Sequence, residues 1–437
     1  VSTPQCCPSR ATTITGQYPN NHGVEANRPG YPTLDRKSNV LPVWLQRAGY
    51  QTIHVGKYLN GYTGARGMHP APGWDSWLTM TASDYSNPVF SVNGELMRYP
   101  DQHLSDVIGE MSVAAVERNM PRSKPLYLQV DHFAPHVGGG DRTGRCEGGA
   151  VPAPEDADAF IDEPLPRPPG FNEVDVSDKL GFIQGLEPLG GGDIDEITRR
   201  YRCALASLAS VDRAIADLLR GIRKAGELSN TLVIFTSDNG YAYGEHRLAT
   251  GKGLPYEEHI RVPLVIRPPL GKGFGRTERG SSISDAPVGN VDLAPTILRL
   301  AGADPCRTDK DSSCRRLDGR SLLGVLRGRE PKWSEDRALR IGFFINAEAY
   351  RLSCRWEGFR SSDRVVIRHT ELPDPGDGFR CGPSSAVEHY DRSRDPFQLR
   401  AVETPLSRGQ QRRLNRISRC SGIRKRDPGI RGVPYCE

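Results

Sequence analysis

Four short apolar runs constrain the fold of this chain more than any other feature of its sequence. Each run is continuous and rich in β-branched residues, and each is followed by polar residues or glycine; they span Gln51 to Val55, Leu126 to Val130, Thr231 to Thr236 and Val262 to Ile266. Such runs are typical of buried strands in a parallel or mixed sheet that helices cover. We therefore predict an α/β layer architecture.

The strongest helical signal lies directly before the third of these runs. Apolar residues recur every three or four positions from about Asp195 to Ala225, and Gly226 then supplies a stop signal. Later short runs predict antiparallel strands of a smaller C-terminal part; they span Ile341 to Ile345, Ala349 to Leu352 and Arg364 to Arg368. A length of 437 residues fits one large domain and one smaller one.

A long stretch without periodicity separates the second and third runs. Between His136 and Asp193 the sequence is rich in glycine, proline and acidic residues. A loop region of this length inside a compact domain is usually functional or disordered. We interpret it as a wall of a substrate cleft.

Residues 6–17 combine a cysteine pair with helix signals: they read Cys-Cys-Pro-Ser-Arg-Ala-Thr-Thr-Ile-Thr-Gly-Gln. Pro8 suits the first position of a helix, and Gly16 can end it two turns later. Cys6 then lies just before a helix N-terminus, where free N–H groups favour an anion, and Arg10 can reach the same place. The alternative is that Cys6 and Cys7 are structural thiols or disulfide partners before an ordinary helix.

This segment resembles the sulfatase signature, in which the cysteine of Cys-x-Pro-Ser-Arg is converted to formylglycine. The resemblance implies that Cys6 is the converted residue and that the fold is an alkaline-phosphatase-like α/β/α sandwich with a mixed central sheet and a smaller C-terminal α+β subdomain. In that family a first strand, ending in two calcium-binding aspartates, precedes the signature. We therefore expect residues 1–335 to be a catalytic domain lacking its first strand, with residues 336–437 as the C-terminal subdomain and any signal peptide missing.

A second element of the resemblance is Ser237-Asp238-Asn239-Gly240, which follows the third predicted strand. It is similar to the family's second metal-binding element, which implies that Asp238 and Asn239 bind calcium together with the converted Cys6. Carboxylate and amide oxygens are suitable ligands for this hard cation. Taken alone, Asp-Asn-Gly is more often a plain turn.

Gly56-Lys57-Tyr58-Leu59-Asn60-Gly61-Tyr62 follows the first predicted strand. It resembles the active-site lysine element of the N-acetylglucosamine-6-sulfatase and extracellular heparan endosulfatase branch. The resemblance implies that Lys57 binds the sulfate as a point charge and that Asn60 contacts substrate. A Gly-Lys pair after a strand is by itself commonplace.

Two further segments complete the expected pocket. Ala134-Pro135-His136 matches the position of a sulfate-facing histidine that assists the leaving alcohol, with His132 as the competing choice. The segment from Gly244 to Leu264 resembles the one that presents a second sulfate-binding lysine, which places Lys252 in the pocket. His246 is expected to line the cleft, and a structural role is its alternative.

The implied activity is hydrolysis of sulfate monoesters. Hydrated formylglycine at Cys6, bound to calcium, would attack sulfur, while Arg10, Lys57 and Lys252 hold the sulfuryl charge and His136 assists the leaving group. The implied partners are a sulfated carbohydrate or other sulfate ester and a formylglycine-generating enzyme. The alternatives are a phosphate or phosphonate monoester hydrolase of the same superfamily, and a catalytically silent sugar-binding protein or fragment.

Charge and cysteine content restrict partners and compartment. The 58 Lys and Arg against 53 Asp and Glu are interspersed, so we expect no nucleic-acid surface; only Arg408 to Arg431 is strongly basic, and its simplest interpretation is a solvated tail. No apolar run is long enough to span a membrane. Ten cysteines suggest an extracytoplasmic protein, secreted or periplasmic. The pairs that could close small loops are Cys306 with Cys314, Cys354 with Cys381, and Cys420 with Cys436.

Overall fold

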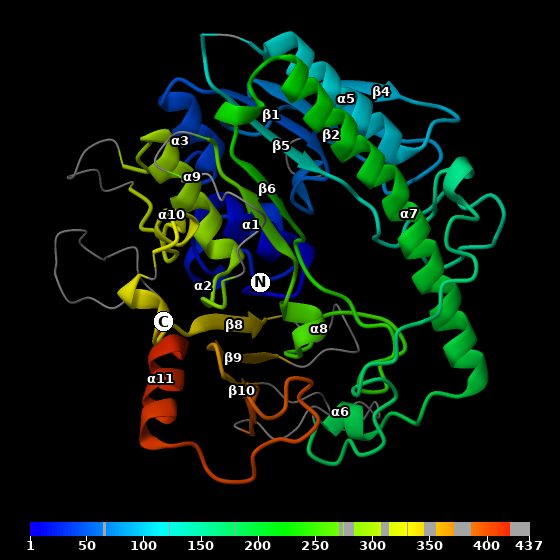
Figure 1. Cartoon of the computed structure of the whole chain (residues 1–437), viewed down its shortest axis with the longest axis vertical. Helices are drawn as coiled ribbons and strands as arrows, with labels where there is room; N and C mark the ends of the chain where they lie inside the picture. Colours follow the sequence, from blue (N-terminus) through cyan, green and yellow to red (C-terminus); the bar gives the residue numbers. More distant parts are fainter. Residues whose placement is uncertain are drawn as a thin grey trace.

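Helices cover both faces of a mixed sheet in the computed structural model of the chain (Figure 1). The structure describes residues 1–437 with the exception of 64–66, 122, 180, 271–273, 275–283, 307–313, 330, 345–354, 371–385 and 420–437.

The central sheet has five strands in the order β4-β3-β2-β1-β5. Their bounds are β1 Gln51–Gly56, β2 Ser76–Met80, β3 Val89–Val92, β4 Glu95–Arg98 and β5 Leu126–Asp131. Strand β1 runs parallel to both β2 and β5, whereas β3 is antiparallel to β2 and β4. The two strands predicted here, β1 and β5, are confirmed, and the sheet is mixed.

Two helical layers enclose this sheet. On one side α5 (Leu104–Asn119) packs on the sheet, and α7 (Gly191–Lys224) packs alongside α5. On the other side α3 (Leu41–Arg47) packs against α9 (Leu293–Ala301) through an apolar cluster that includes Trp44. The α/β/α layering is confirmed.

The predicted long helix is confirmed as α7, but it begins four residues earlier than the apolar periodicity. Gly190 donates its backbone N–H to the Asp193 carboxylate at 2.9 Å, so the helix is capped in a polar first turn. Hydrophobic spacing reports only the part of a helix that faces a core, which explains the difference.

Strands β6 (Val233–Thr236) and β7 (Leu264–Arg267) exist as predicted, but they form an antiparallel pair of their own. Phe235 on β6 is 46% exposed and Val265 on β7 is 61% exposed. The prediction of buried strands is therefore wrong for this pair. Branched apolar residues indicate a strand, but burial depends on which layers pack on each face.

The C-terminal part is an antiparallel sheet in the order β11-β10-β9-β8. The strands are β8 Leu339–Phe343, β9 Trp356–Arg360, β10 Arg364–His369 and β11 Val387–Asp391, and helix α11 (Arg408–Ser418) packs on them. The predicted strands at 341 and 364 are confirmed, and the one from Ala349 to Leu352 lies outside the described residues. The division at residue 335 stays a prediction.

The remaining described elements are short. They are α1 Cys6–Thr15, α2 Pro19–His22, α6 Gly181–Gln184, α8 Glu257–Ile260 and α10 Leu323–Leu326, with 3-10 turns at Tyr31–Thr33, Pro154–Asp156, Leu228–Asn230, Asn290–Asp292 and Lys332–Ser334. Within the parts of the chain that the structure describes, no helix is long and apolar enough to cross a membrane.

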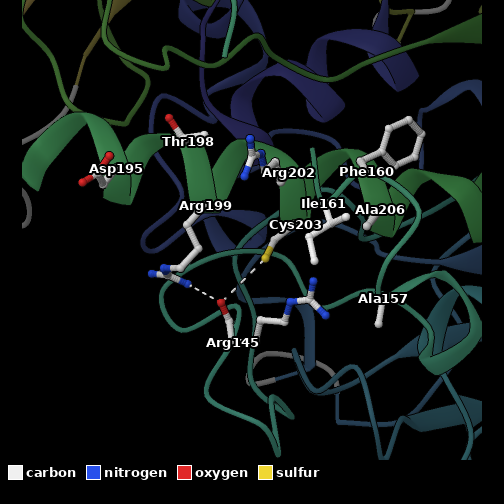
Figure 2. Close-up of a pocket in the computed structure, with 10 residues that line it drawn as sticks. All are labelled: Arg145, Ala157, Phe160, Ile161, Asp195, Thr198, Arg199, Arg202, Cys203 and Ala206. Atoms are coloured by element: carbon white, nitrogen blue, oxygen red, sulfur yellow. Dashed lines mark hydrogen bonds between the residues drawn. The ribbon is translucent and has the colours of Figure 1, made fainter. Parts of the chain in front are cut away.

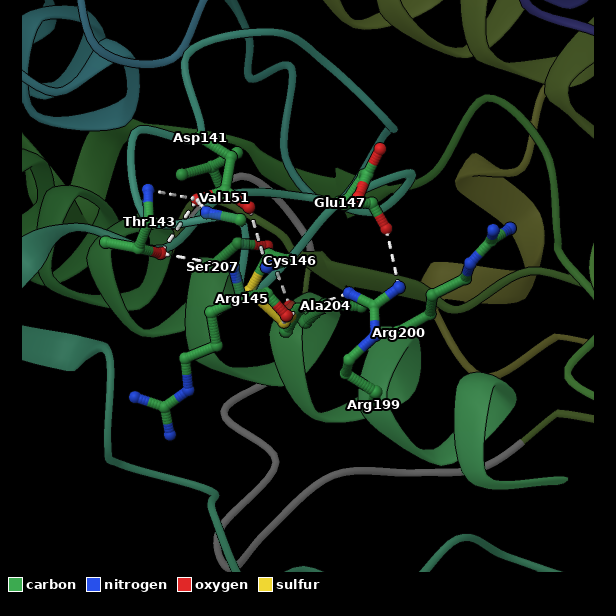
Figure 3. Close-up of a disulfide and its surroundings, with 12 residues drawn as sticks. Asp141, Thr143, Arg145, Cys146, Glu147, Val151, Arg199, Arg200, Ala204 and Ser207 are labelled. Atoms are coloured by element: carbon green, nitrogen blue, oxygen red, sulfur yellow. Dashed lines mark hydrogen bonds between the residues drawn. A yellow bond between two sulfur atoms is a disulfide. The ribbon is translucent and has the colours of Figure 1, made fainter. Parts of the chain in front are cut away.

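The glycine- and proline-rich loop region is attached to α7. A cavity of about 390 Å³ lies between them, lined by the arginines Arg145, Arg199 and Arg202 and by apolar side chains (Figure 2). Beside it a disulfide joins Cys146 to Cys203, and Arg199 donates hydrogen bonds to the carbonyls of Arg145 and Glu147 at 2.8 and 2.7 Å (Figure 3). The role of this region as a cleft wall stays a prediction.

The cysteine predictions have different outcomes. The pair Cys306–Cys314 is confirmed as a disulfide, whereas the bond between Cys146 and Cys203 was not anticipated because these residues are 57 positions apart. Cys6 and Cys7 are free and buried. The pairs Cys354 with Cys381 and Cys420 with Cys436 lie outside the described residues.

A fully buried ion pair joins the N-cap of α9 to the segment that precedes β8. Arg337 donates two hydrogen bonds to the Asp292 carboxylate at 2.8 and 2.7 Å, and both side chains are 0% exposed. Asp292 also accepts backbone N–H groups from Gly289 and Arg320. Removing one partner of such a pair leaves an uncompensated buried charge.

We predict that Arg337→Met lowers the free energy of unfolding by about 3–5 kcal/mol, because the Asp292 carboxylate loses its buried counter-charge. The measurement is urea unfolding of the purified variant. The matched control is Arg142→Met, which removes an arginine that is 59% exposed and paired with the exposed Asp101. The control should cost less than about 1 kcal/mol. Equal effects of the two substitutions would contradict the role assigned to the buried pair.

Candidate active site

Helix α1 (Cys6–Thr15) lies near the middle of the view, between the central sheet and the C-terminal sheet (Figure 1). Cys6 is its first residue and is 1% exposed, so the helix begins two residues before the predicted start at Pro8. Gly16 ends the helix in the left-handed conformation, with φ of 64°. The Asn290 side chain holds the first turn by donating to the carbonyl and hydroxyl of Ser9 at 3.0 and 2.9 Å.

Lys252 connects the cysteine with the Asp-Asn-Gly loop. Its Nζ lies 3.1 Å from Cys6 Sγ and 3.1 Å from Asn239 Oδ1. The sequence placed these three residues in one pocket from separate motifs, and the structure brings them together. The loop depends on Gly240, because a Cβ there would lie 2.0 Å from the carbonyl oxygen of Glu258.

Arg10 lies between two carboxylates. Its Nε donates to Asp238 Oδ2 at 2.6 Å, and its Nη1 lies 3.3 Å from Asp131 Oδ1. Nη1 also donates to the carbonyl of Lys57 at 2.8 Å. Burial opposes its charge, but Asp131 and Asp238 outweigh that cost and raise the pKa of Arg10. One guanidinium therefore joins the start of α1 to the ends of β1, β5 and β6.

Asp131 and His54 belong to this cluster, and sequence reasoning missed both. Asp131 Oδ2 accepts from the Gln129 side chain at 2.7 Å and lies 3.1 Å from His54 Nε2, while His54 Nδ1 lies 2.7 Å from Thr79 Oγ1. Burial opposes ionisation of Asp131, but Arg10 and then His54 hold its pKa below its usual value. Their only signal in the sequence is a titratable residue within or at the end of a predicted strand.

Lys57 follows β1 at a point where the backbones of β1 and β5 come very close together. Gly56 has φ of 100°, and a Cβ there would lie 2.1 Å from the carbonyl of Asp131. The Lys57 N–H donates to that same carbonyl at 2.8 Å, and its Nζ lies 5.4 Å from the centre of the Phe133 ring. The backbone of Lys57 is therefore fixed against β5, while its side chain carries the ammonium group into the candidate active site.

His136 is the histidine that hydrogen-bonds the Cys6 side chain. Its Nδ1 lies 2.7 Å from the carbonyl of Val137, and Tyr85 donates to the His136 carbonyl at 2.7 Å. The competitor His132 is kept neutral, since burial lowers its pKa to about 4. The choice of His136 over His132 as the catalytic histidine stays a prediction.

The two adjacent cysteines have opposite electrostatic environments. Burial opposes ionisation of Cys6, but Lys57 and then Lys252 outweigh it and lower the pKa of Cys6 to about 5. Burial dominates at Cys7 and raises its pKa to about 12. Position 6 therefore stabilises a negative charge, whereas position 7 belongs to an apolar cluster.

The Asp-Asn-Gly loop offers oxygen ligands of the kind calcium requires. Burial opposes ionisation of Asp238, but Arg10, Lys57 and Lys252 hold its pKa well below the usual value, so the carboxylate is charged. Calcium takes six to eight oxygen ligands. Within the described part of the chain, no group of three or more His, Cys, Asp or Glu residues gathers as a metal site. Asp238 and Asn239 could supply two of these oxygens, and in this structure they accept hydrogen bonds from Arg10 and Lys252.

Asn60 and His246 were expected to contact substrate. The Asn60 carbonyl accepts from the N–H of Tyr31 at 2.8 Å, and its side-chain oxygen is buried, so its contact with substrate stays a prediction. His246 is 1% exposed, with Nδ1 2.6 Å from Glu173 and Nε2 3.7 Å from Glu258. Burial opposes its charge, but the two carboxylates raise the pKa of His246 to about 9. This placement fits the structural alternative, and we do not assign His246 to the substrate.

Comparison with known proteins gives one consistent family. The family model described as "Sulfatase" matches residues 1–303. An arylsulfatase of Volvox carteri is 36% identical over 74% of this chain and 52% of its own length, and human N-acetylglucosamine-6-sulfatase is 32% identical over 74% of this chain and 56% of its own length. An extracellular sulfatase SULF-1 homolog of Drosophila melanogaster is 30% identical over 75% of this chain. The chain spans about half the length of the first two relatives.

Solved structures show the fold. A protein in complex with its substrate D-glucosamine-2-N,6-O-disulfate superposes with a TM-score of 0.72 and 23% identity, over 95% of this chain and 87% of that protein. The phosphonate monoester hydrolase of Agrobacterium radiobacter gives a TM-score of 0.59 and 21% identity, over 92% of this chain and 82% of that enzyme. The fold is the alkaline-phosphatase-like sandwich expected from the sequence.

We predict that unmodified Cys6 is a thiolate at neutral pH, because its pKa of about 5 lies below that of an ordinary thiol. The measurement is a pH titration of thiolate ultraviolet absorbance, taken as the difference between the unconverted protein and its Cys6→Ser variant. The difference in thiolate absorbance should appear as the pH rises through about 5. Lys57→Met should move the midpoint upward, and Cys7→Ser is the control without effect. A midpoint near the ordinary cysteine value of about 8.5 would contradict the prediction.

Proposed function

Because the chain belongs to the sulfatase family, we propose that it hydrolyses sulfate monoesters, with a sulfated sugar or glycan as its substrate. One observation carries the proposal: the buried Cys6 side chain is surrounded by the cations Lys57 and Lys252 and by His136. The carbohydrate substrate is supported by the name of one relative, an N-acetylglucosamine-6-sulfatase.

The charges at the site suit a tetrahedral anion. Lys57 and Lys252 present compact ammonium charges, and Arg10 adds a guanidinium at the first turn of α1. In a buried setting these cations stabilise charge that develops on sulfuryl oxygens more strongly than they would in water. They would hold the sulfate in place while the bond to the alcohol breaks.

A cysteine sulfur lacks the means to release sulfate, so we propose that Cys6 is converted to formylglycine by a formylglycine-generating enzyme. Formylglycine supplies an oxygen nucleophile, and calcium, when bound, supplies Lewis acidity. Asp238 and Asn239 are the residues that would hold the ion on this chain. Because Lys252 contacts both Asn239 and Cys6, it orients the nucleophile position relative to that loop.

His136 is placed to assist the leaving group. Its side chain reaches Cys6, so it lies on the edge of the space that a bound sulfate would occupy. A hydrogen bond or proton from His136 to the ester oxygen would neutralise the alcohol as it leaves.

We also propose an extracytoplasmic site of action. The disulfides Cys146–Cys203 and Cys306–Cys314 support an oxidising compartment, and one relative is an extracellular sulfatase.

Hydrolysis of phosphate or phosphonate monoesters is the alternative within the same fold, since sulfate and phosphate differ mainly in charge. A catalytically silent sugar-binding protein is the second alternative.

We predict that Cys6→Ala abolishes turnover, since the oxygen nucleophile can only be made at that position. The full-length protein is produced together with a formylglycine-generating enzyme, and the peptide containing Cys6 is examined by mass spectrometry for conversion of thiol to aldehyde. Hydrolysis of an aryl sulfate and the matching aryl phosphate is then measured on the same preparation.

Cys7→Ala is the matched control, and it should keep activity within about tenfold because Cys7 only packs in an apolar cluster. If Cys7→Ala is inactive while Cys6→Ala is active, the assignment of Cys6 as the converted residue is wrong. Faster hydrolysis of the phosphate ester would favour the phosphatase alternative. An unconverted cysteine in a folded protein without activity on either ester would favour the silent alternative.

Asp131 is predicted to position Arg10. Asp131→Asn removes one of the two carboxylates that orient the guanidinium, so kcat should fall roughly 10- to 100-fold while KM changes little. Steady-state kinetics measure this split, and Asp131→Glu should recover part of kcat. The control is Asp75→Asn, which changes a carboxylate that binds Thr52 on β1 and has no contact with the site residues named above. Equal kcat values for both Asn variants would contradict the role of Asp131.

A further inference from the structure

Helix α11 is the first part of the segment expected to be a solvated tail, and the structure shows it docked. Leu414 and Ile417 are buried against Phe359 and Val366 of the C-terminal sheet. Arg368 donates to the Asn415 side chain at 2.6 Å, which fixes the helix from the sheet side. The Ser407 hydroxyl accepts from the N–H of Gln410 and caps the first turn. The expectation of a solvated tail is therefore wrong for residues 408–418.

The opposite face of α11 carries a line of exposed arginines, which we call the arginine stripe: Arg408, Arg412, Arg416 and Arg419. At about 100° per residue these positions fall within an arc of about 80°, on the side away from Leu414 and Ile417. With a rise of 1.5 Å per residue, the stripe extends over roughly 17 Å. It is a straight row of positive charge on a fixed scaffold.

The start of this row is electrostatically unfavourable for the helix, whereas Arg416 lies in the last turn, where a cation is favourable. Residues 405–419 contain no Asp or Glu, and Arg408, Arg412 and Arg419 have no ion pair with any described residue. Like charges four residues apart destabilise a helix, and a cation in the first turn, where Arg408 lies, opposes the helix dipole. Arg408 and Arg412 therefore lower the stability of the helix, and a partner of opposite charge would restore it.

The form of the stripe restricts that partner. A small anion would contact only one or two arginines, whereas a linear polyanion can follow the whole row. A membrane surface is a poor fit, because the apolar residues Leu414 and Ile417 face the sheet and leave no apolar side to enter lipid. Guanidinium groups bind sulfate-type anions through paired N–H donors.

We propose that the arginine stripe of α11 is a binding surface for a linear sulfated polysaccharide, outside the candidate active site. This inference rests on the proposed function, because the sulfated substrate class is what supplies the polyanion. The stripe would retain a long chain near the enzyme through contacts that a single sulfated sugar cannot make. This proposal narrows the expected substrate from a sulfate ester in general to a sulfated polymer.

The experiment measures binding of the full chain to immobilised heparin, used as the sulfated polysaccharide probe, over a range of NaCl concentrations. The stripe variant carries Arg408→Gln, Arg412→Gln, Arg416→Gln and Arg419→Gln, which keep helix-forming side chains. Affinity near physiological salt should fall about 10- to 100-fold, and the salt dependence should weaken by roughly one counterion for each arginine that binds sulfate.

The matched control removes the same four charges elsewhere, at exposed positions far from α11 in sequence: Arg98→Gln, Arg118→Gln, Arg223→Gln and Lys224→Gln. Its heparin affinity should stay within about threefold of the parent protein, since only long-range attraction changes. An equal loss of heparin affinity in both variants would show that the effect depends on net charge alone, and it would overturn the proposal. Duplex DNA that competes as well as heparin at equal charge would overturn it too, in favour of a nucleic-acid surface.

Hydrolysis of a small aryl sulfate separates this inference from the proposed function. The stripe variant should keep the parent rate on the small ester, because its arginines do not belong to the candidate active site. A parent protein that binds heparin through the stripe but hydrolyses no sulfate ester would refute the proposed function and leave the binding surface intact. If the fourfold variant unfolds, the Arg412→Gln/Arg416→Gln double variant tests the same surface, and unchanged heparin affinity there overturns the proposal.

Discussion

The shared guanidinium of Arg10 is the contact on which the candidate site depends. Asp131 comes from the end of β5, Asp238 follows β6, and the Lys57 carbonyl follows β1, yet one side chain binds all three. Removing a partner from a buried charge cluster costs about 3–5 kcal/mol, far more than an exposed ion pair contributes. The loops that carry the candidate site are therefore held together by one guanidinium.

The same cluster explains how a buried position can favour an anion. Burial alone makes ionisation unfavourable, as the raised pKa of Cys7 shows one residue away from Cys6. Lys57 and Lys252 reverse this effect only at Cys6, because their ammonium groups converge on that side of α1. The chemical difference between two neighbouring cysteines is thus set by residues from distant parts of the chain, each fixed by strand ends and close backbone contacts.

The sequence predicted the individual strands and helices well, but it predicted less well how they pair and pack. The runs at β1, β5, β6 and β7 were found because continuous apolar residues mark strands, and the motif residues converge as expected. The pairing of β6 with β7 alone depends on contacts between separate segments, which local composition does not encode. His54 and Asp131 were missed for the same reason: each lies in a strand that holds other polar residues as well, and only the pairing of β1 with β5 brings the two together.

His246 shows how a motif residue can act without touching substrate. Its charge is balanced by Glu173 from the long loop region and by Glu258 from α8, while the backbone of His246 donates to Gly170 at 2.8 Å. Arg247 adds a hydrogen bond to the Glu173 carbonyl at 2.8 Å. These contacts fasten the loop region to the segment that carries Lys252 six residues after His246. The loop region and the segment that carries Lys252 are therefore joined through this buried cluster, so a change in the loop would be transmitted to the position of Lys252.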